Sequence, residues 1–212
     1  MDERLIDISV PFDADTPEWP GDTPFSCGWS WSMAEGGSVN VSKWTLSPHV
    51  GTHADAPLHV SRDGIGADGI PAAPFLGDAR VVDVSQVSGS ISLEQLQRAG
   101  YEAGTTRLLL QTGRCVSQGT FPATWPSLEP AAAQALVRAG VRLVGVDCPS
   151  VDDRESKTLD VHHALFDGGA FVLENLDLRG VAPGRYELIA LPLKVGALDA
   201  APVRAFLRPQ TP

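Results

Sequence analysis

HVGTHADAPLH, residues 49–59, holds three of the five histidines in the chain together with an aspartate. His49, His53, Asp55 and His59 all occupy odd positions, so an extended strand would direct these four side chains to one face. On such a strand His53 and Asp55 would lie about 6.6 Å apart, a separation that one cation can bridge. The segment therefore predicts a strand that carries part of a metal site.

The same segment cannot be straight along its whole length. On a straight strand His49 and His59 would lie about 33 Å apart, too far to share one ion. A helix would bring positions i and i+4 together, but Gly51 and Pro57 disfavour a helix. We therefore expect the chain to bend at Gly51 and at the step from Ala56 to Pro57. Nitrogen and oxygen ligands without a thiolate favour zinc, with manganese or iron as alternatives.

A second group of candidate ligands lies far downstream. His162 and His163 are adjacent, so at most one of them should face inward, and periodicity does not choose between them. Glu174 closes the apolar run Ala-Phe-Val-Leu, where a buried carboxylate needs a cation or a hydrogen-bond donor beside it. An exposed position just past a strand would explain Glu174 equally well. The two groups suggest one site assembled from distant segments.

The composition is typical of a folded protein. The 212 residues are 43% hydrophobic and 20% charged, which predicts one domain, residues 1–212, with a buried core. The net charge of −10 argues against nucleic acid or an anionic membrane as a partner. No apolar run approaches the ~20 residues of a membrane span. With no visible secretory signal and three cysteines that form no CxxC pair, we expect a cytoplasmic protein.

Apolar runs separated by turn signals predict alternating strands and helices. Strands are expected at residues 5–9, 39–47, 79–84, 107–112, 141–147, 170–174, 186–191 and 203–207, and a loop at residues 11–31. A capping box from Ser92 to Gln95 opens a short helix that stops at Gly100, and a second helix covers residues 129–139. The helix-glycine-strand units predict an α/β fold with a mixed sheet.

Residues 47–59, SPHVGTHADAPLH, resemble the HxGTHxDxPxH signature of the metal-dependent cyclase family. The likeness runs from Ile6 to Arg208 through TPEWPGDTP, VNVSKWTLSPH, GVDCPSVDDRESKTLDVHHAL and YELIALPLKVGALDAAPVRAFLR. Within the family, SKTLDVH and LPLKVGALDAAPVRA are most similar to the bacterial kynurenine formamidase branch. The resemblance implies a single compact domain with a swivelling β/β/α fold, assembled as a homodimer or homotetramer.

The resemblance also implies a hydrolase with two zinc ions per subunit, or another divalent metal such as manganese. Its reaction would convert N-formyl-L-kynurenine to L-kynurenine and formate in tryptophan breakdown. By position, one zinc would be held by His49, His53 and Asp55. Asp55 and Glu174 would bridge to a second zinc completed by His162, which the twelve-residue spacing to the glutamate selects over its neighbour.

Further roles follow from the resemblance. His59 would be the proton donor and acceptor beside a metal-bound hydroxide, and Trp19 would contact the substrate. Trp19 could also be a simple hydrophobic plug between prolines. Cys148 stands where the family commonly has threonine, and Asn175 where the formamidases often have glycine. Neither departure removes an implied ligand.

Other kinds of function fit the sequence less well. A serine hydrolase of the nucleophile-elbow type would need a GxSxG motif, which the chain lacks. Cys148 beside a proline is more typical of a structural cysteine than of a nucleophile. A cyclase-family hydrolase acting on a different amide, ester or lactam stays open. A non-catalytic metal-binding module would keep the ligands but would have no need for His59.

Overall fold

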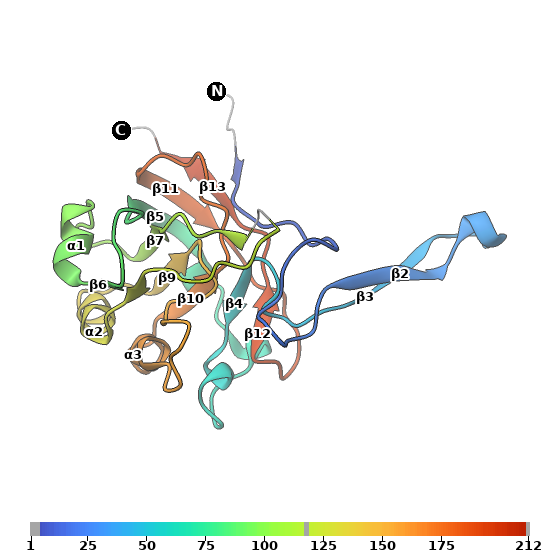
Figure 1. The fold of residues 1–212 in the computed structure, drawn as a ribbon, viewed down its shortest axis with the longest axis horizontal. Coiled ribbons are helices and arrows are strands. Elements are labelled where there is room, and N and C mark those ends of the chain that lie inside the picture. Colours follow the sequence, from blue (N-terminus) through green and yellow to red (C-terminus); the bar gives the residue numbers. More distant parts are fainter. Residues whose placement is uncertain (1–4, 117–118, 211–212) are drawn as a thin grey trace.

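In the computed structural model, which describes residues 5–116 and 119–210, nine strands form one mixed sheet (Figure 1). These strands are β1 (Ile6–Asp7), β4 (His53–Asp55), β5 (Leu76–Asp83), β7 (Arg107–Gln111), β9 (Leu143–Val146), β10 (Phe171–Glu174), β11 (Gly184–Ile189), β12 (Ala200–Pro202) and β13 (Phe206–Pro209). Their order across the sheet is β1-β13-β11-β5-β7-β9-β10-β4-β12. Neighbours from β5 to β10 are parallel and the other pairs are antiparallel, so the predicted mixed sheet is confirmed.

Three helices, α1 (Leu93–Arg98), α2 (Pro130–Arg138) and α3 (Asp160–Asp167), cover one face of this sheet (Figure 1). Strand side chains alternate between the two faces, as the two-residue period of a strand requires. Val82, Leu108 and Val144 pack with the helices, and Val81, Leu109 and Leu143 pack in a second core cluster. The capping box predicted at Ser92 and Gln95 is confirmed at the start of α1.

Two smaller pairs of strands lie outside the main sheet. β2 (Ser26–Trp31) and β3 (Val41–Thr45) form an antiparallel hairpin that projects away from the body of the molecule (Figure 1). β6 (Ser90–Ile91) and β8 (Ser127–Leu128) pair in parallel beside the helices. The prediction of a loop throughout residues 11–31 is therefore wrong for β2, whose extended backbone is stabilised by pairing with β3. No helix among the described residues has the length and apolar character that crossing a membrane requires.

The predicted strand at residues 203–207 is confirmed only at Phe206 and Leu207, which begin β13, and is wrong at residues 203–205. The chain leaves β12 at one edge of the sheet and enters β13 near the opposite edge, so residues 203–205 are the connection between them. Val203 and Ala205 are buried in the second core cluster, and their apolar character reflects this burial. The helix α3 was not predicted. Short 3-10 turns in the described part of the chain include Met33–Glu35, Pro57–His59, Ala67–Gly69 and Ala73–Phe75.

Candidate metal centre and active site

The strand β4 directs His53 and Asp55 to the same face of the sheet, as predicted, and both side chains are buried. The neighbouring strand β10 pairs with it antiparallel, and Glu174 is the residue opposite His53. Side chains directly opposite each other on paired strands lie on one face, in contact distance. Glu174 is consequently buried beside His53, with Oε2 3.6 Å from the Nε2 atom of the imidazole.

His49 and His59 reach the same place through the two predicted bends. Gly51 has a φ of 64°, and a Cβ atom there would lie 2.3 Å from the ring of Phe12, so the bend needs glycine. After β4, Pro57 opens the 3-10 turn Pro57–His59, which turns the chain back. The centroids of the His49 and His59 rings are 4.4 Å apart. The expectation of a curled rather than straight segment is confirmed.

Helix α3 lies over this face of the sheet and supplies His162, which is buried, whereas His163 is only partly buried. Asp152 positions the start of the helix, because its carboxylate accepts hydrogen bonds from the backbone N–H groups of Val161 and His162 at 3.0 and 3.1 Å. The same carboxylate accepts a bond from Nδ1 of His162 at 2.7 Å. One buried side chain therefore sets both the helix terminus and the orientation of the imidazole.

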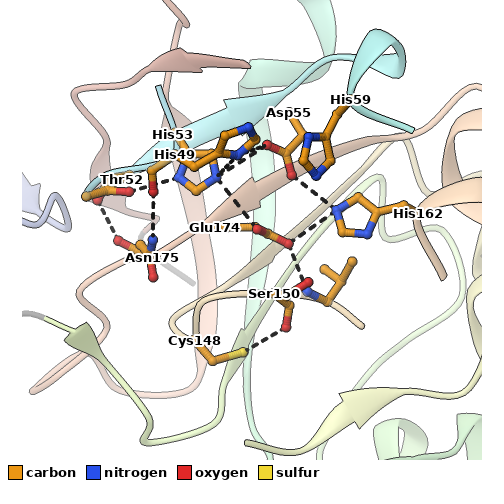
Figure 2. A network of polar contacts seen from close by, with 12 residues as sticks. His49, Thr52, His53, Asp55, His59, Cys148, Ser150, His162, Glu174 and Asn175 are labelled. Atoms are coloured by element: carbon orange, nitrogen blue, oxygen red, sulfur yellow. Dashed lines mark hydrogen bonds and ion pairs between the residues drawn. The ribbon is translucent and has the colours of Figure 1, made fainter. Parts of the chain in front are cut away.

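A first group of three acceptor atoms converges in the strand β4 region (Figure 2). Nε2 of His49 is hydrogen-bonded to the carboxylate of Asp199 at 2.9 Å, and Nδ1 of His53 is hydrogen-bonded to the carbonyl of Gly51 at 2.9 Å. Each imidazole therefore directs its other nitrogen toward Asp55. These inward nitrogens lie 3.2 Å apart, and 3.1 and 3.3 Å from Oδ1 of Asp55. In the described part of the chain this buried oxygen makes no well-aligned hydrogen bond.

These distances fit a metal ion. Donor atoms about 2.0–2.1 Å from a tetrahedral zinc are about 3.3–3.4 Å from one another. Each imidazole also gives its outer nitrogen to an oxygen acceptor, the arrangement that orients metal-ligating histidines. The residues His49, His53 and Asp55 thus form an acceptor group suited to one divalent cation.

A second group shares Asp55 with the first (Figure 2). Nε2 of His162 lies 3.1 Å from Oδ2 of Asp55 and 3.4 Å from Oε1 of Glu174. The Oε1 atom also accepts a hydrogen bond from the backbone N–H of Val151 at 2.9 Å, which holds the carboxylate in place. The five residues for which the sequence analysis predicts ligand roles are therefore brought together, in two groups with Asp55 common to both.

The charges in this cluster are strongly interdependent. Burial lowers the pKa of His49, but contacts with Asp199 and Asp55 outweigh it and raise that pKa to about 10. Burial is likewise outweighed at His53, where the charge of Asp55 and the contact with Glu174 raise the pKa to about 9. Burial alone would raise the pKa of Asp55, yet the surrounding imidazoles hold it well below its ordinary value. The carboxylates therefore require positive charge beside them, from protons or from a metal ion.

His59 lies next to both groups but belongs to neither. Its Nδ1 atom is 3.3 Å from Oδ2 of Asp199, and its ring centroid is 5.7 Å from that of His162. Among the described residues Nε2 of His59 has no hydrogen-bond partner, and the side chain lines the adjacent cavity. This geometry leaves one nitrogen of an oriented imidazole available to exchange a proton with a molecule in the cavity.

That cavity has a volume of about 570 Å³, within the range of small-molecule sites. The candidate ligands His49, His162 and Glu174 line it together with Trp19. The Trp19 ring packs edge-on against Phe121, with centroids 5.4 Å apart, and against Trp125 at 5.8 Å. Trp19 is thus both a packed aromatic side chain and part of the cavity wall, where the sequence analysis left these two interpretations open.

The two departures from the family pattern have local explanations. Cys148 is fully buried, with its Sγ 3.2 Å from the carbonyl of Ser150, and burial raises the pKa of its thiol well above the ordinary value. A thiol in this state is a poor nucleophile. Asn175 has a φ of 55°, a conformation that glycine and asparagine adopt more readily than other residues. Its backbone carbonyl accepts a bond from Thr52 at 2.6 Å.

Two acidic residues with clear contacts to the site were missed by the sequence analysis, Asp152 and Asp199. Asp199 immediately precedes β12, and its backbone carbonyl accepts a bond from Ala56 at the end of β4. The stretches GVDCPSVDDRESKTLDVHHAL and LPLKVGALDAAPVRA contain both aspartates. Their location in stretches that resemble the family could have marked both aspartates as candidate site residues. No periodic pattern in the sequence could have done so.

Comparisons with known proteins identify the family of the chain. The Cyclase family model matches residues 6–153, which include the whole histidine-rich segment. The kynurenine formamidase of Bacillus thuringiensis (strain Al Hakam) is 47% identical over 204 residues, covering 96% of this chain and 97% of the relative. The kynurenine formamidase of Geobacillus thermodenitrificans (strain NG80-2) is 46% identical over 203 residues, covering 96% of each protein.

Solved structures show the same fold. A predicted metal-dependent hydrolase from Bacillus stearothermophilus has a TM-score of 0.81 at 27% identity, covering 96% of this chain and 97% of that one. Isatin hydrolase A from Labrenzia aggregata has a TM-score of 0.79 at 24% identity, covering 96% and 93%. The resemblance seen in the sequence is confirmed: the chain belongs to the cyclase family.

Proposed function

We propose that the chain is a metal-dependent amidohydrolase that converts N-formyl-L-kynurenine to L-kynurenine and formate, in tryptophan breakdown. The observation that carries this proposal is the convergence of two acceptor groups on Asp55, beside His59 and next to an aromatic-walled cavity that His49, His162 and Glu174 line. The full-length similarity to kynurenine formamidases supports the choice of substrate.

The proposed metals are two zinc ions, one held by His49, His53 and Asp55 and one by Asp55, His162 and Glu174. The donor set supports this choice, because it consists of imidazole nitrogens and carboxylate oxygens without a thiolate. When bound, such a pair of ions lowers the pKa of water and polarises a carbonyl group.

The side chains of the protein supply binding and proton transfer. Trp19 and Phe121 present aromatic surfaces against which the ring of the substrate packs. Asp199 accepts from Nδ1 of His59 and so directs Nε2 toward the cavity. His59 then takes a proton at Nε2 from the water that attacks the formyl carbon, and returns this proton to the aniline nitrogen as the C–N bond breaks and formate is released.

We also propose how the chain is organised and assembled. We treat residues 1–212 as one domain, since the ligand candidates come from β4 and β10 of one sheet, from the turn that leads into β4, and from a helix packed on the sheet. A homodimer or homotetramer is supported by the projecting hairpin, on which Trp29, Trp31 and Trp44 are 61%, 66% and 51% exposed. Apolar side chains gathered on a projecting element are typical of an interface between subunits. A cytoplasmic location is supported by the sequence, whose three cysteines form no CxxC pair.

The test is hydrolysis of N-formylkynurenine by zinc-loaded protein, followed by the near-ultraviolet absorbance of kynurenine. We expect turnover that a chelator abolishes and that added zinc restores. A panel of other amides, esters and lactams run beside it tests the alternative activity within the family. Preference for one of these, with metal bound and N-formylkynurenine untouched, would contradict the proposed substrate.

A His59→Gln variant tests the proton-transfer role separately. We expect kcat to fall about 100-fold or more, with the bound metal unchanged, because general acid–base catalysis contributes about 10²–10⁴ in rate. His163→Gln is the matched control, since this neighbouring histidine of α3 is not part of either acceptor group. Full activity in His59→Gln would show that the assigned role is wrong.

A further inference from the structure

The cavity that holds the candidate centre has a positively charged side. Arg154 and Lys157 line it, and both lie in the connection between β9 and α3. The acidic side chains that line the cavity are Glu174, already part of the centre, and Asp22, whose carboxylate accepts a bond from the backbone N–H of Thr23 at 2.6 Å. In a chain with a net charge of −10, two cations at one substrate cavity favour an anionic group on the ligand.

Arg154 is held in position by contacts that leave most of its donors unused. Nη1 donates to the carbonyl of Ala123 at 3.0 Å, and the guanidinium carbon lies 5.7 Å from the centroid of the Phe121 ring. Within the described part of the chain no carboxylate forms an ion pair with it. A guanidinium has five N–H donors in a planar fork that suits a carboxylate.

The aromatic wall connects this cation to the centre. Phe121 contacts both the guanidinium of Arg154 and the ring of Trp19. N-formylkynurenine has a matching order of groups: a formamide, an aromatic ring and, beyond the ring, an amino-acid tail with a carboxylate. With the formamide at the metal ligands and the ring against Trp19 and Phe121, the tail extends to the cationic side.

We propose that Arg154, with Lys157 beside it, binds the carboxylate of the amino-acid tail and so selects amino-acid formanilides over formanilides without a tail. This assignment rests on the proposed function of the same site. Arg154 is then a specificity residue that acts on substrate binding, and it takes no part in proton transfer at the formyl group.

A purely structural role for Arg154 predicts a different result. Suppose that its hydrogen bond to Ala123 and its contact with Phe121 served only to hold the cavity wall in place. Loss of Arg154 would then weaken the binding of every substrate that packs on that wall. If Arg154 binds the carboxylate, its loss weakens the binding only of substrates that carry the tail. A pair of substrates that differ by the tail therefore separates the two roles.

The experiment measures kcat and KM of wild type, Arg154→Gln and Arg154→Lys for N-formylkynurenine and for 2-formamidoacetophenone, which lacks the tail. For Arg154→Gln we expect kcat/KM on N-formylkynurenine to fall roughly 10- to 150-fold, mainly through KM, as loss of a charge-assisted hydrogen bond predicts. The rate on 2-formamidoacetophenone should change less than about twofold, and Arg154→Lys should recover part of the loss. Arg138→Gln, an exposed arginine on α2 outside the cavity, controls for the change in net charge.

Equal losses on both substrates, or no loss on N-formylkynurenine, would overturn the proposal. Calorimetric binding of kynurenine and of 2-aminoacetophenone adds a readout that does not need hydrolysis. Arg154→Gln should weaken kynurenine binding and leave 2-aminoacetophenone binding unchanged. If wild type hydrolyses neither formamide, the proposed function fails, while the binding comparison still decides whether Arg154 recognises the carboxylate.

Discussion

Replacing Asp152 by alanine tests whether the buried support of the metal ligands works as the contacts indicate. The carboxylate accepts three hydrogen bonds, from two backbone N–H groups at the start of α3 and from Nδ1 of His162. Its removal frees the imidazole to rotate or to take the other tautomer, with the proton on the nitrogen that faces Asp55 and Glu174. That form of His162 cannot bind a cation.

The expected size of the effect follows from these three contacts. Loss of the bonds at the helix start costs about 1 kcal/mol, as loss of a helix cap does. A buried imidazole N–H without a partner costs about 1–3 kcal/mol more. Together they predict a fall of about 2–4 kcal/mol in the unfolding free energy of the metal-free protein. Loss of the oxygen partner of a ligating histidine lowers metal affinity about 10- to 100-fold.

Zinc affinity is measured by competition with a chromogenic chelator, and stability by denaturant unfolding of the metal-free protein. Asp160→Ala is the matched control, because Asp160 is exposed on the first turn of the same helix. It should leave zinc affinity unchanged within about twofold and cost at most about 1 kcal/mol. Unchanged zinc affinity in a folded Asp152→Ala protein would refute the role of Asp152 in orienting His162.

Three other predictions concern pH, substrate binding and assembly. Because the pKa values of His49 and His53 are raised to about 10 and about 9, the metal-free protein holds protons that the unfolded chain releases near pH 6.5. Their contribution to its unfolding free energy should therefore be full below pH 6.5 and be lost as the pH rises to about 10, and no fall over this range in denaturant titrations with chelator present would contradict this. Trp19→Ala should raise KM for N-formylkynurenine about tenfold with a smaller change in kcat, because an aromatic contact in the cavity is lost. An unchanged KM would show that Trp19 does not contact the substrate. Trp31→Asp, at the exposed hairpin, should reduce the mass measured by light scattering to that of a monomer, and an unchanged oligomer would place the interface elsewhere.

Local stereochemistry made much of the arrangement of residues 49–59 predictable. Alternation along a strand places His53 and Asp55 on one face, and both observed bends occur where the sequence supplies Gly51 and Pro57. The pairing that brings Glu174 next to His53 involves residues from distant parts of the chain. Alternation within each segment is visible in the sequence, whereas the register between the two strands is not.

Tertiary contacts explain the features that were not predicted. Helix α3 is short and polar at its start, and Asp152, which lies outside it, accepts from its first N–H groups. Asp199 acts on His49 and His59 from the connection before β12, where no periodic pattern marks it. The choice of His162 over His163 came from family spacing, and the observed burial of His162 agrees with that choice.

The most direct test of the account is a zinc titration of metal-free protein that records bound zinc and N-formylkynurenine hydrolysis in the same samples. We expect no activity without metal, two zinc ions bound per chain at saturation, and activity that rises as the ions bind. The double variant His53→Ala/His162→Ala should bind neither ion and stay inactive. Hydrolysis by metal-free protein, or none with two ions bound, would contradict the account.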